Sequence, residues 1–323
     1  MKNLSFKEIE EIIKEAEKIL LATHQGPDAD AIGSLAALGM YLKKIKKPNY
    51  LLSVSGVPES LKFIPGAKLI KSKHPKKPYD LIIGLDYGSE WRLGLDGYFK
   101  KYPKIPILIF DHHPVANQGA NFGVIDTTYS STSEIIYDYL KTIKFKIDKN
   151  IAYALAIGIL TDTGFFKYTA SPKPLEILAE LMKEFKIKPV EIDNALSGQV
   201  KFEALKLSGK ILSRAKYKEK ENFIYSWFKR RELNKRHLTT DDLKGLVERL
   251  RNLKNGRFAL LLIEEKQNRI RGELRSRPDK NYNVAKLAQK FGSGGGHKFA
   301  AGFRCKGTID SVLKLVAKYA REK

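Results

Sequence analysis

The chain has 323 residues, and at roughly 100 to 200 residues per domain this length predicts two domains. Hydrophobic residues at 43% and charged residues at 29% exclude a disordered chain. Lys and Arg outnumber Asp and Glu by 59 to 36, and the net charge of +23 would attract polyanions such as nucleic acid, although a generically basic surface explains the scattered lysines equally well.

Several features argue against a secreted or membrane protein. The one cysteine, Cys305, excludes a disulfide framework and a thiolate metal site within one chain. Residues 1–19 predict an amphipathic helix with acids throughout, unlike a signal or transit peptide. No apolar run approaches the ~20 residues of a membrane span. We therefore expect a cytoplasmic protein.

Strands and helices alternate through the first half of the chain. Its short apolar runs are typical of a parallel sheet that is covered on both faces. The predicted strands are 18–24, 49–56, 79–88, 105–113 and 122–128, and the predicted helices are 4–18, 30–45, 133–143, 149–161 and 174–186. This alternation predicts an α/β domain with a doubly wound, mainly parallel sheet over residues 1–187.

A segment without strand character separates this half from the next. Residues 188–205 are the predicted linker, which includes a short helix. Beyond it the predicted strands are 222–228, 256–265 and 268–276, and the predicted helices are 239–253, 283–291 and 309–321. Residues 206–323 are expected to form a smaller mixed α+β domain, and two such domains would leave a cleft between them.

Imidazoles and carboxylates collect at the ends of the predicted strands. They are His24, with Asp28 and Asp30 just after it, then Asp86, and then the run Asp111, His112 and His113. Ligand sites form at the carboxyl ends of parallel strands, so these side chains are expected on one rim. Asp162 ends an apolar helix pattern, where a lone buried acid would be costly unless a cation compensates it.

Taken alone, Asp28 and Asp30 would be an N-cap and a first-turn acid of a helix. The recurrence of the same residue types on one rim favours a metal site instead. The candidate ligands are His24, Asp28, Asp30, Asp86, His112 and Asp162. The set contains no sulfur, which suits Mn²⁺, Mg²⁺, Co²⁺ or Fe²⁺ better than structural zinc, and one carboxylate could bridge two ions about 3.5–4 Å apart. Two such cations in a basic protein point to phosphoryl chemistry.

These motifs resemble those of the DHH phosphoesterase superfamily. They are H-x-x-x-D-x-D at 24–30, the strand-terminal Asp86, the literal D-H-H at 111–113 and T-D-T-G at 161–164. In the second half, S-G-G-G-H-K-F-A-A-G at 293–302 is similar to the glycine-rich segment of the DHH-associated C-terminal domain. Length and domain content resemble the nanoRNase group, the bifunctional oligoribonucleases and pAp phosphatases. Ala29 departs from the glycine often found there, with little expected consequence.

The resemblance implies a binuclear centre that usually holds manganese. One ion would be held by His24, Asp28 and Asp86, and the other by Asp30, Asp86, His112 and Asp162, with Asp86 as the bridge. The implied catalytic residues are Asp86, His113 and Asp111. His113 would contact the scissile phosphate and help to protonate the leaving oxygen, while Asp111 would orient a ligand histidine.

A second set of residues is expected to bind substrate. Residues 292–297 have the composition of a flexible linker, but they continue directly into an apolar segment, which favours a loop whose N–H groups approach a phosphate. Strand alternation predicts that Arg275 and Arg277 project to one face, where their guanidinium groups could bind phosphate oxygens. The alternative interpretation of this segment is a solvated basic edge strand. The predicted substrate-binding residues are Arg275, Ser276, Arg277, Gly294, Gly295, Gly296 and His297.

Two further stretches lie near the same rim. Ser89 and Arg92, after the second motif, could face substrate or cap a helix, and they stay unassigned. Residues 130–133 are expected to cap the next helix. Neither stretch enters the predicted site.

The features together favour metal-assisted hydrolysis of short oligoribonucleotides, or of the 3′-phosphate of pAp, with two divalent cations as cofactors.

A pyrophosphatase of the same family would carry a different second domain, and a single-strand DNA exonuclease would tend to carry an additional one. A dinucleotide phosphodiesterase stays open as an alternative. A non-catalytic RNA-binding protein would be expected to lack a ligand, and none is missing. The sequence does not rank short RNA, short DNA, dinucleotides and pAp, and it leaves the oligomeric state open, a homodimer included.

Overall fold

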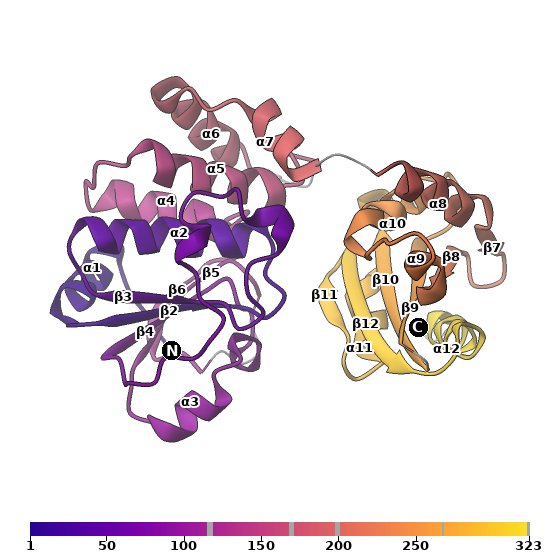
Figure 1. The fold of residues 1–323 in the computed structure, drawn as a ribbon, viewed down its shortest axis with the longest axis horizontal. Coiled ribbons are helices and arrows are strands. Elements are labelled where there is room, and N and C mark those ends of the chain that lie inside the picture. Colours follow the sequence, from indigo (N-terminus) through magenta and orange to yellow (C-terminus); the bar gives the residue numbers. More distant parts are fainter. Residues whose placement is uncertain (115–118, 168–170, 198–200, 267, 322–323) are drawn as a thin grey trace. The chain divides into compact units, whose positions relative to one another are not determined.

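The structure is a computed structural model that describes residues 1–114, 119–167, 171–197, 201–266 and 268–321. The chain divides into two compact units, Met1–Gly198 and Gln199–Lys323, each described by itself below (Figure 1). Residues 198–200 of the predicted linker lie outside the described residues. In the described part of the chain, no helix is long and apolar enough to cross a membrane.

The first unit is built on six parallel strands in the order β1-β6-β5-β4-β2-β3. The strands are β1 (Lys2–Asn3), β2 (Ile19–Thr23), β3 (Asn49–Leu52), β4 (Leu81–Leu85), β5 (Ile107–Asp111) and β6 (Phe122–Ile125). The predicted parallel sheet is confirmed, and each predicted strand is present but shorter than its apolar run. The sequence pattern does not predict β1.

Alternate residues of these strands pack into two hydrophobic cores, one on each face of the sheet. Leu21 packs with the helices on one face, whereas Leu20 and Ala22 pack with the 3₁₀ turn Glu90–Leu93 and α3 on the other. Figure 1 shows α2, α4 and α5 together above the sheet and α3 below it. The helices are α1 (Phe6–Glu15), α2 (Ala29–Lys44), α3 (Asp96–Lys101), α4 (Thr132–Thr142), α5 (Lys149–Asp162), α6 (Lys173–Phe185) and α7 (Pro189–Ser197). Coverage on both faces confirms the doubly wound arrangement.

Two glycines let the helices above the sheet approach closely. A Cβ on Gly33 of α2 would lie 2.6 Å from the carbonyl oxygen of Ala154 in α5. A Cβ on Gly158, one turn further along α5, would lie 2.5 Å from Oδ1 of Asp30 and 2.0 Å from Oγ of Ser133. The contact of α2, α4 and α5 is therefore tight where the first residues of α2 and α4 meet α5.

The second unit has a mixed sheet in the order β11-β12-β10-β9-β8-β7, in which β8 and β9 are parallel and the other pairs antiparallel. The strands are β7 (Lys216–Lys218), β8 (Phe223–Lys229), β9 (Phe258–Lys266), β10 (Arg269–Ser276), β11 (Gly295–His297) and β12 (Ala300–Lys306). The helices are α8 (Phe202–Ser213), α9 (Arg230–Asn234), α10 (Leu246–Arg251), α11 (Val284–Gln289) and α12 (Ile309–Arg321). One core lies beneath α11 and α12, and the other beneath α8, α9 and α10.

The second unit contains β7, β12, α8 and α9, which the sequence pattern does not predict, and it differs from the sequence prediction in two further places. The helix predicted at 239–253 is wrong in extent: a 3₁₀ turn at Asp241–Leu243 is followed by the six-residue α10, because Gly245 has φ 85°, a left-handed backbone that no helix continues through. The predicted glycine-rich loop contributes a strand, β11, which pairs with β12.

Candidate active site

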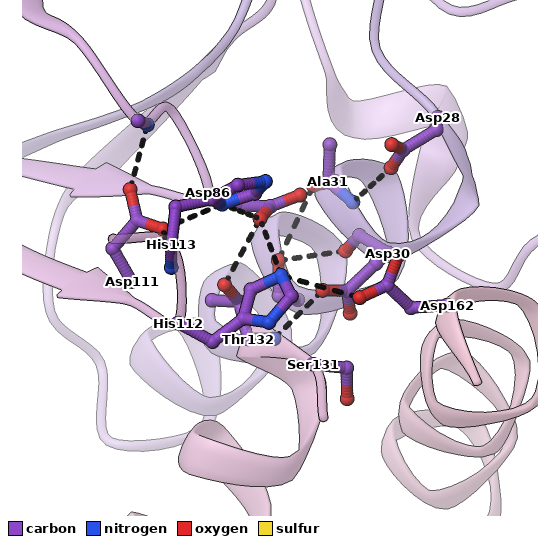
Figure 2. A network of polar contacts seen from close by, with 12 residues as sticks. Asp28, Asp30, Ala31, Asp86, Asp111, His112, His113, Ser131, Thr132 and Asp162 are labelled. Carbon is purple, nitrogen blue, oxygen red and sulfur yellow. Dashed lines mark hydrogen bonds and ion pairs between the residues drawn. The ribbon is translucent and has the colours of Figure 1, made fainter. Parts of the chain in front are cut away.

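Asp86 stands at the centre of the rim that the strand ends form (Figure 2). It follows β4, is 1% exposed, and has φ 54°, a left-handed backbone that costs a non-glycine residue of order 1–3 kcal/mol. Its Oδ1 lies 3.5 Å from Nε2 of His112 and 3.3 Å from Nδ1 of His113, and its Oδ2 lies 3.9 Å from Nε2 of His24. The strained turn therefore aims one carboxylate at three imidazoles.

The remaining candidate ligands surround Asp86 from other elements. Asp28 caps α2 by accepting the N–H of Ala31, and its other oxygen lies 3.8 Å from Nε2 of His24. Asp162, the last residue of α5, lies 3.2 Å from Nε2 of His112. Three groups offer ligand atoms that all lie within 4.8 Å of one another: His24, Asp28 and Asp86; Asp30, His112 and Asp162; and Asp86, His112 and His113.

Asp30 is the most firmly anchored of these acids. It lies in the first turn of α2, is 1% exposed, and accepts the backbone N–H groups of Thr132 and Ser133 at 2.7 and 2.9 Å. Those groups are the first N–H donors of α4, so the positive end of that helix also favours the carboxylate. Asp30 thus joins two helices at the rim.

Asp111 and His113 form a pair beside the cluster. Oδ1 of Asp111 accepts the backbone N–H of His113 and lies 2.8 Å from its Nδ1. Oδ2 of Asp111 accepts the N–H groups of Tyr87 and Gly88, which follow Asp86. This contact with Asp111 at Nδ1 fixes the orientation of the His113 ring, and the second ring nitrogen, Nε2, is not part of it. Asp111 therefore positions His113, which with Asp86 and His112 forms one of the groups that could hold a metal ion.

The charges of the histidines and carboxylates act strongly on one another. Burial lowers the pKa of His112, but the hydrogen bond and charge of Asp86 outweigh it and raise the pKa to about 9. For His113, burial is likewise outweighed by hydrogen bonds to Asp111 and Asp86, which bring the pKa to about 11. The pKa of Asp86 falls far below its ordinary value, because the two histidines overcome the effect of burial. A carboxylate that stays ionised while buried fits a metal bridge.

The pKa values of the partly buried Asp162 and the buried Asp30 shift in the opposite direction. Burial raises the pKa of Asp162 to about 7, against the positive charge of His112. Burial, together with the charges of Asp86 and Asp162, holds the pKa of Asp30 well above its ordinary value. Carboxylates that repel one another in a buried cluster are stabilised by a cation between them, and oxygen and imidazole donors suit Mn²⁺ or Mg²⁺. The donor set therefore fits divalent metal ions.

The predicted substrate-binding residues lie on or next to β10 and β11, the two strands of the second unit that flank β12. Arg275 on β10 pairs in register with Ala300 on β12, and Ala300 pairs with His297 on β11. Residues directly opposite one another project to the same face of a sheet, so Arg275 and His297 share a face about two strand spacings, roughly 10 Å, apart. Nε of Arg275 donates to Glu248 of α10 at 2.8 Å. The structure thus brings the two segments together within this unit.

Ser276 and Arg277 are less suited to the role predicted for them. Ser276 is fully buried, and its hydroxyl donates to the carbonyl oxygen of Tyr282. Arg277 lies beyond the end of β10, and its guanidinium donates twice to Asp279. Strand alternation therefore does not extend from Arg275 to Arg277.

Packing accounts for two of the three consecutive glycines. A Cβ on Gly294 would lie 2.0 Å from the carbonyl oxygen of Ala288, and Gly296, at φ 136°, would bring a Cβ within 2.5 Å of the carbonyl oxygen of Ala300. Gly295 has no atom within 4 Å of such a position, so its backbone faces open space. Of the three, Gly295 is free to admit a ligand.

Two residues near the rim were not predicted as part of the site. Thr132 is buried, and its hydroxyl donates to Oδ1 of Asp86 at 3.1 Å. The guanidinium of Arg92 borders the same space as His113: a Cβ on Gly88 would lie 3.4 Å from its Nη1 and 3.9 Å from Cγ of His113. Among the described residues this guanidinium has no hydrogen bond or ion pair. Thr132 could have been noticed as the first helical residue beside the rim, and Arg92 is noticed because it follows the second motif but stays unassigned from the sequence.

Family models match both units of the chain. The DHH family model, for its N-terminal domain, matches residues 18–159, and the DHHA1 domain model matches residues 220–322. The first match ends three residues before Asp162, which is placed beside the other acids by the structure alone. The two matches confirm the resemblance that the sequence motifs indicate.

Relatives match the chain over most of its length. The bifunctional oligoribonuclease and PAP phosphatase NrnA of Thermus thermophilus is 26% identical over 321 residues, which cover 97% of this chain and 93% of the relative. The protein of the same name from Bacillus subtilis is 30% identical over 293 residues, 88% of each chain. The crystal structure of an exopolyphosphatase-related protein from Bacteroides fragilis superposes with a TM-score of 0.89 at 25% identity, over 98% of this chain and 95% of that one.

Proposed function

This chain belongs to the DHH family of phosphoesterases, and from that premise we propose that it hydrolyses short oligoribonucleotides to mononucleotides and removes the 3′-phosphate of pAp. Membership makes it a metal-dependent hydrolase. The substrates are those in the names of the two relatives, which the chain matches over most of their length.

The observation that carries the proposal is the convergence of six side chains from distant parts of the sequence, with Asp86 at their centre. We propose that His24, Asp28 and Asp86 hold one divalent ion and that Asp30, Asp86, His112 and Asp162 hold the second. Manganese is the proposed ion, since imidazole and carboxylate donors without sulfur suit it. When bound, such ions stabilise the negative charge of a phosphate under attack and acidify water.

The chain's own residues supply orientation and a proton. Asp111 holds the His113 ring at Nδ1, so Nε2 is the proposed donor of a proton to the leaving oxygen. Thr132 donates to Asp86 and so helps to fix the bridging carboxylate. The unpaired guanidinium of Arg92 adds positive charge beside His113, which favours an anionic substrate there.

The second unit is the proposed holder of the substrate nucleotide. We propose 1–187 as the catalytic domain, 188–205 as the linker and 206–323 as the substrate-binding domain, acting in the cytoplasm. The binding residues proposed are Arg275, Ser276, Arg277, Gly294, Gly295, Gly296 and His297. Arg275 and His297 support the proposal because they project from the same face of the sheet, and Gly295 supports it because its backbone borders open space. The buried Ser276 supports it least.

A product time course tests this proposal. Labelled RNA and DNA of two to twelve residues, with pAp in parallel, would be incubated with the manganese-loaded chain. We expect mononucleotides from the shortest RNA and AMP from pAp, and no products once EDTA is added. Cleavage of long DNA with little activity on short RNA or pAp would contradict the proposal.

A further inference from the structure

Positive charge is unevenly divided between the two units. Residues 1–198 contain 27 Lys and Arg against 23 Asp and Glu, a net charge of +4, whereas residues 199–323 contain 32 against 13, a net charge of +19. The predicted substrate-binding arginines do not account for this excess, because Arg275 and Arg277 are paired with Glu248 and Asp279. Most of the chain's field therefore originates elsewhere in the second unit.

A hollow of about 610 Å³ between α8, β8 and α9 gathers part of this charge; we name it the basic hollow. Six cationic side chains line it: Lys210, Arg214, Lys229, Arg231, Lys235 and Arg236. One acid, Glu232, shares the lining, and both Nη atoms of Arg214 donate to its carboxylate at 2.8 and 3.1 Å. The hollow therefore keeps a strong positive excess.

Most of these cations have no partner to neutralise them. Nη1 of Arg236 donates to the carbonyl oxygen of Glu232. Among the residues that the structure describes, the charged ends of Lys210, Lys229, Arg231 and Lys235 form no hydrogen bond or ion pair. Like charges gathered in this way repel one another and attract an anion.

Trp227 gives the basic hollow an aromatic wall. It lies on β8, is partly exposed, and lines the hollow beside the cations. Its ring centre is 6.0 Å from Cζ of Arg214 and 5.8 Å from Nζ of Lys216. An aromatic ring among cations is the combination with which proteins bind single-stranded nucleic acid, since bases stack on the ring and phosphates meet the charges.

The basic hollow is separate from the predicted substrate-binding residues. His297 lies on β11, at one edge of the sheet, and Trp227 lies on β8, four strands away in the order β11-β12-β10-β9-β8. At about 4.8 Å per strand this separation is roughly 19 Å, too far for one phosphate to contact both places.

We propose that the basic hollow is a second nucleic-acid site, which binds the phosphate backbone of single-stranded RNA while Trp227 stacks on a base. The choice of RNA rests on the proposed function. A strand of several nucleotides gains affinity from this site, whereas pAp and a dinucleotide gain none, because their phosphates are too few to fill it.

Charge reversal tests the site directly. The triple variant Lys229→Glu, Arg231→Glu and Lys235→Glu changes three unpaired cations of the basic hollow. Anisotropy with a labelled twelve-residue RNA in EDTA would measure binding by the full chain without cleavage. We expect affinity to fall at least about tenfold, and the slope of log affinity against log salt to shrink by about 2, since each phosphate contact on a single strand contributes roughly 0.7.

A matched triple variant controls for the overall field. Lys254→Glu, Lys266→Glu and Lys306→Glu change the net charge equally on exposed residues of the same unit, outside the lining of the basic hollow. This control should lose much less affinity. Equal losses in the two variants, with both melting like the parent chain, would overturn the proposal, because the general field would then explain the binding.

Tryptophan fluorescence adds a local readout. The chain has two tryptophans, Trp91 and Trp227, and Trp91 is 64% exposed on the first unit, so Trp91→Phe leaves Trp227 as the reporter. Twelve-residue RNA should quench it saturably, inorganic polyphosphate should quench it less, and the charge-reversed chain should show no saturable quenching. Binding without quenching, or equal quenching by polyphosphate, would contradict stacking.

Turnover separates this proposal from the proposed function. Hydrolysis of pAp and of a dinucleotide should be the same in the parent and charge-reversed chains. If the parent hydrolyses neither substrate yet binds the twelve-residue RNA through the basic hollow, the proposed function fails and this inference stands. If it hydrolyses both but does not bind the longer RNA, this inference fails alone.

Discussion

The two units of the chain use charge in opposite ways. The first, with 27 basic against 23 acidic residues, is almost balanced, yet it buries Asp30, Asp86 and Asp111 at 1% exposure or less. The second, with 32 against 13, leaves its cations at the surface, and its buried acid Glu221 is paired with Arg321. The net charge of the whole chain says little, but the separate charges of the two units are informative. Buried acids lie where metal chemistry is expected, and surface cations lie where a polyanion would bind.

Asp86→Ala should give the largest difference between the two units, because it should affect hydrolysis but not RNA binding. Loss of the shared carboxylate removes a ligand from both proposed ions, so kcat should fall by at least about 10³-fold, equivalent to ~4 kcal/mol of transition-state stabilisation. Binding of twelve-residue RNA should stay within about twofold, because the cations of the basic hollow belong to the other unit and are unchanged. Asp96→Asn, which alters an exposed acid of α3, serves as the control. Retained turnover in the Asp86 variant would disprove the bridging role.

His113→Ala tests the proton donor within the first unit. We expect kcat on short RNA to fall by about 10²–10⁴-fold, the range typical of a lost general acid. Hydrolysis of bis-p-nitrophenyl phosphate should fall much less, because nitrophenolate leaves without a proton. Asp111→Asn should show the same preference with a smaller loss, since it weakens the contact that orients the His113 ring but keeps the ring itself. A uniform loss on both substrates would assign His113 to metal or phosphate binding instead.

Replacing Arg275 or His297 by Ala tests the second unit's part in substrate recognition. KM for short RNA should rise about tenfold, while kinetics on bis-p-nitrophenyl phosphate change little, because the small substrate has no nucleotide to hold. Arg304→Ala is the matched control: it lies on neighbouring β12, is exposed, and is paired with Glu265. Similar changes on both substrates would count against these residues as nucleotide contacts.

Two glycine substitutions compare packing in the two units. Gly158→Ala adds a methyl group against Asp30 and Ser133 and should lower the free energy of unfolding by about 1–3 kcal/mol and weaken manganese binding. Gly209→Ala, at an exposed position of α8, places a methyl group where no atom lies within 4 Å and should raise the free energy of unfolding by about 0.4–1 kcal/mol. Chemical denaturation measures both changes. A neutral Gly158 variant would mean that the helix contact at Asp30 yields easily.

Much of the first unit can be predicted from local patterns. Short apolar runs indicate β2 to β6, and polar residues at the ends of three of these strands indicate the rim, because parallel strands place their carboxyl ends together. The contacts of Asp30 could not be foreseen, since Thr132 and Ser133 are about a hundred residues away in the chain. The local sequence presents a first-turn helix acid and a candidate metal ligand as alternatives for Asp30. In the structure Asp30 lies in the first turn of α2 and also belongs to the acidic cluster.

The second unit is less predictable because single backbone angles decide its elements. The positive φ of Gly245 divides a segment that is helical by its pattern, and the glycine-rich run forms a hairpin strand only because β12 is beside it. The basic hollow combines residues of α8, β8 and α9 whose charges look scattered along the sequence. Only the fold shows that these cations gather in one place.

Manganese binding to the purified chain tests the central claim most directly. Isothermal titration of the metal-stripped protein, with bound metal counted independently, should give two manganese ions per chain, fewer than two after Asp86→Ala, and two after Asp96→Asn. Activity should disappear with EDTA and return with manganese. A parent chain that binds no divalent ion, or that stays fully active in EDTA, would contradict the account of six side chains converging on a metal centre.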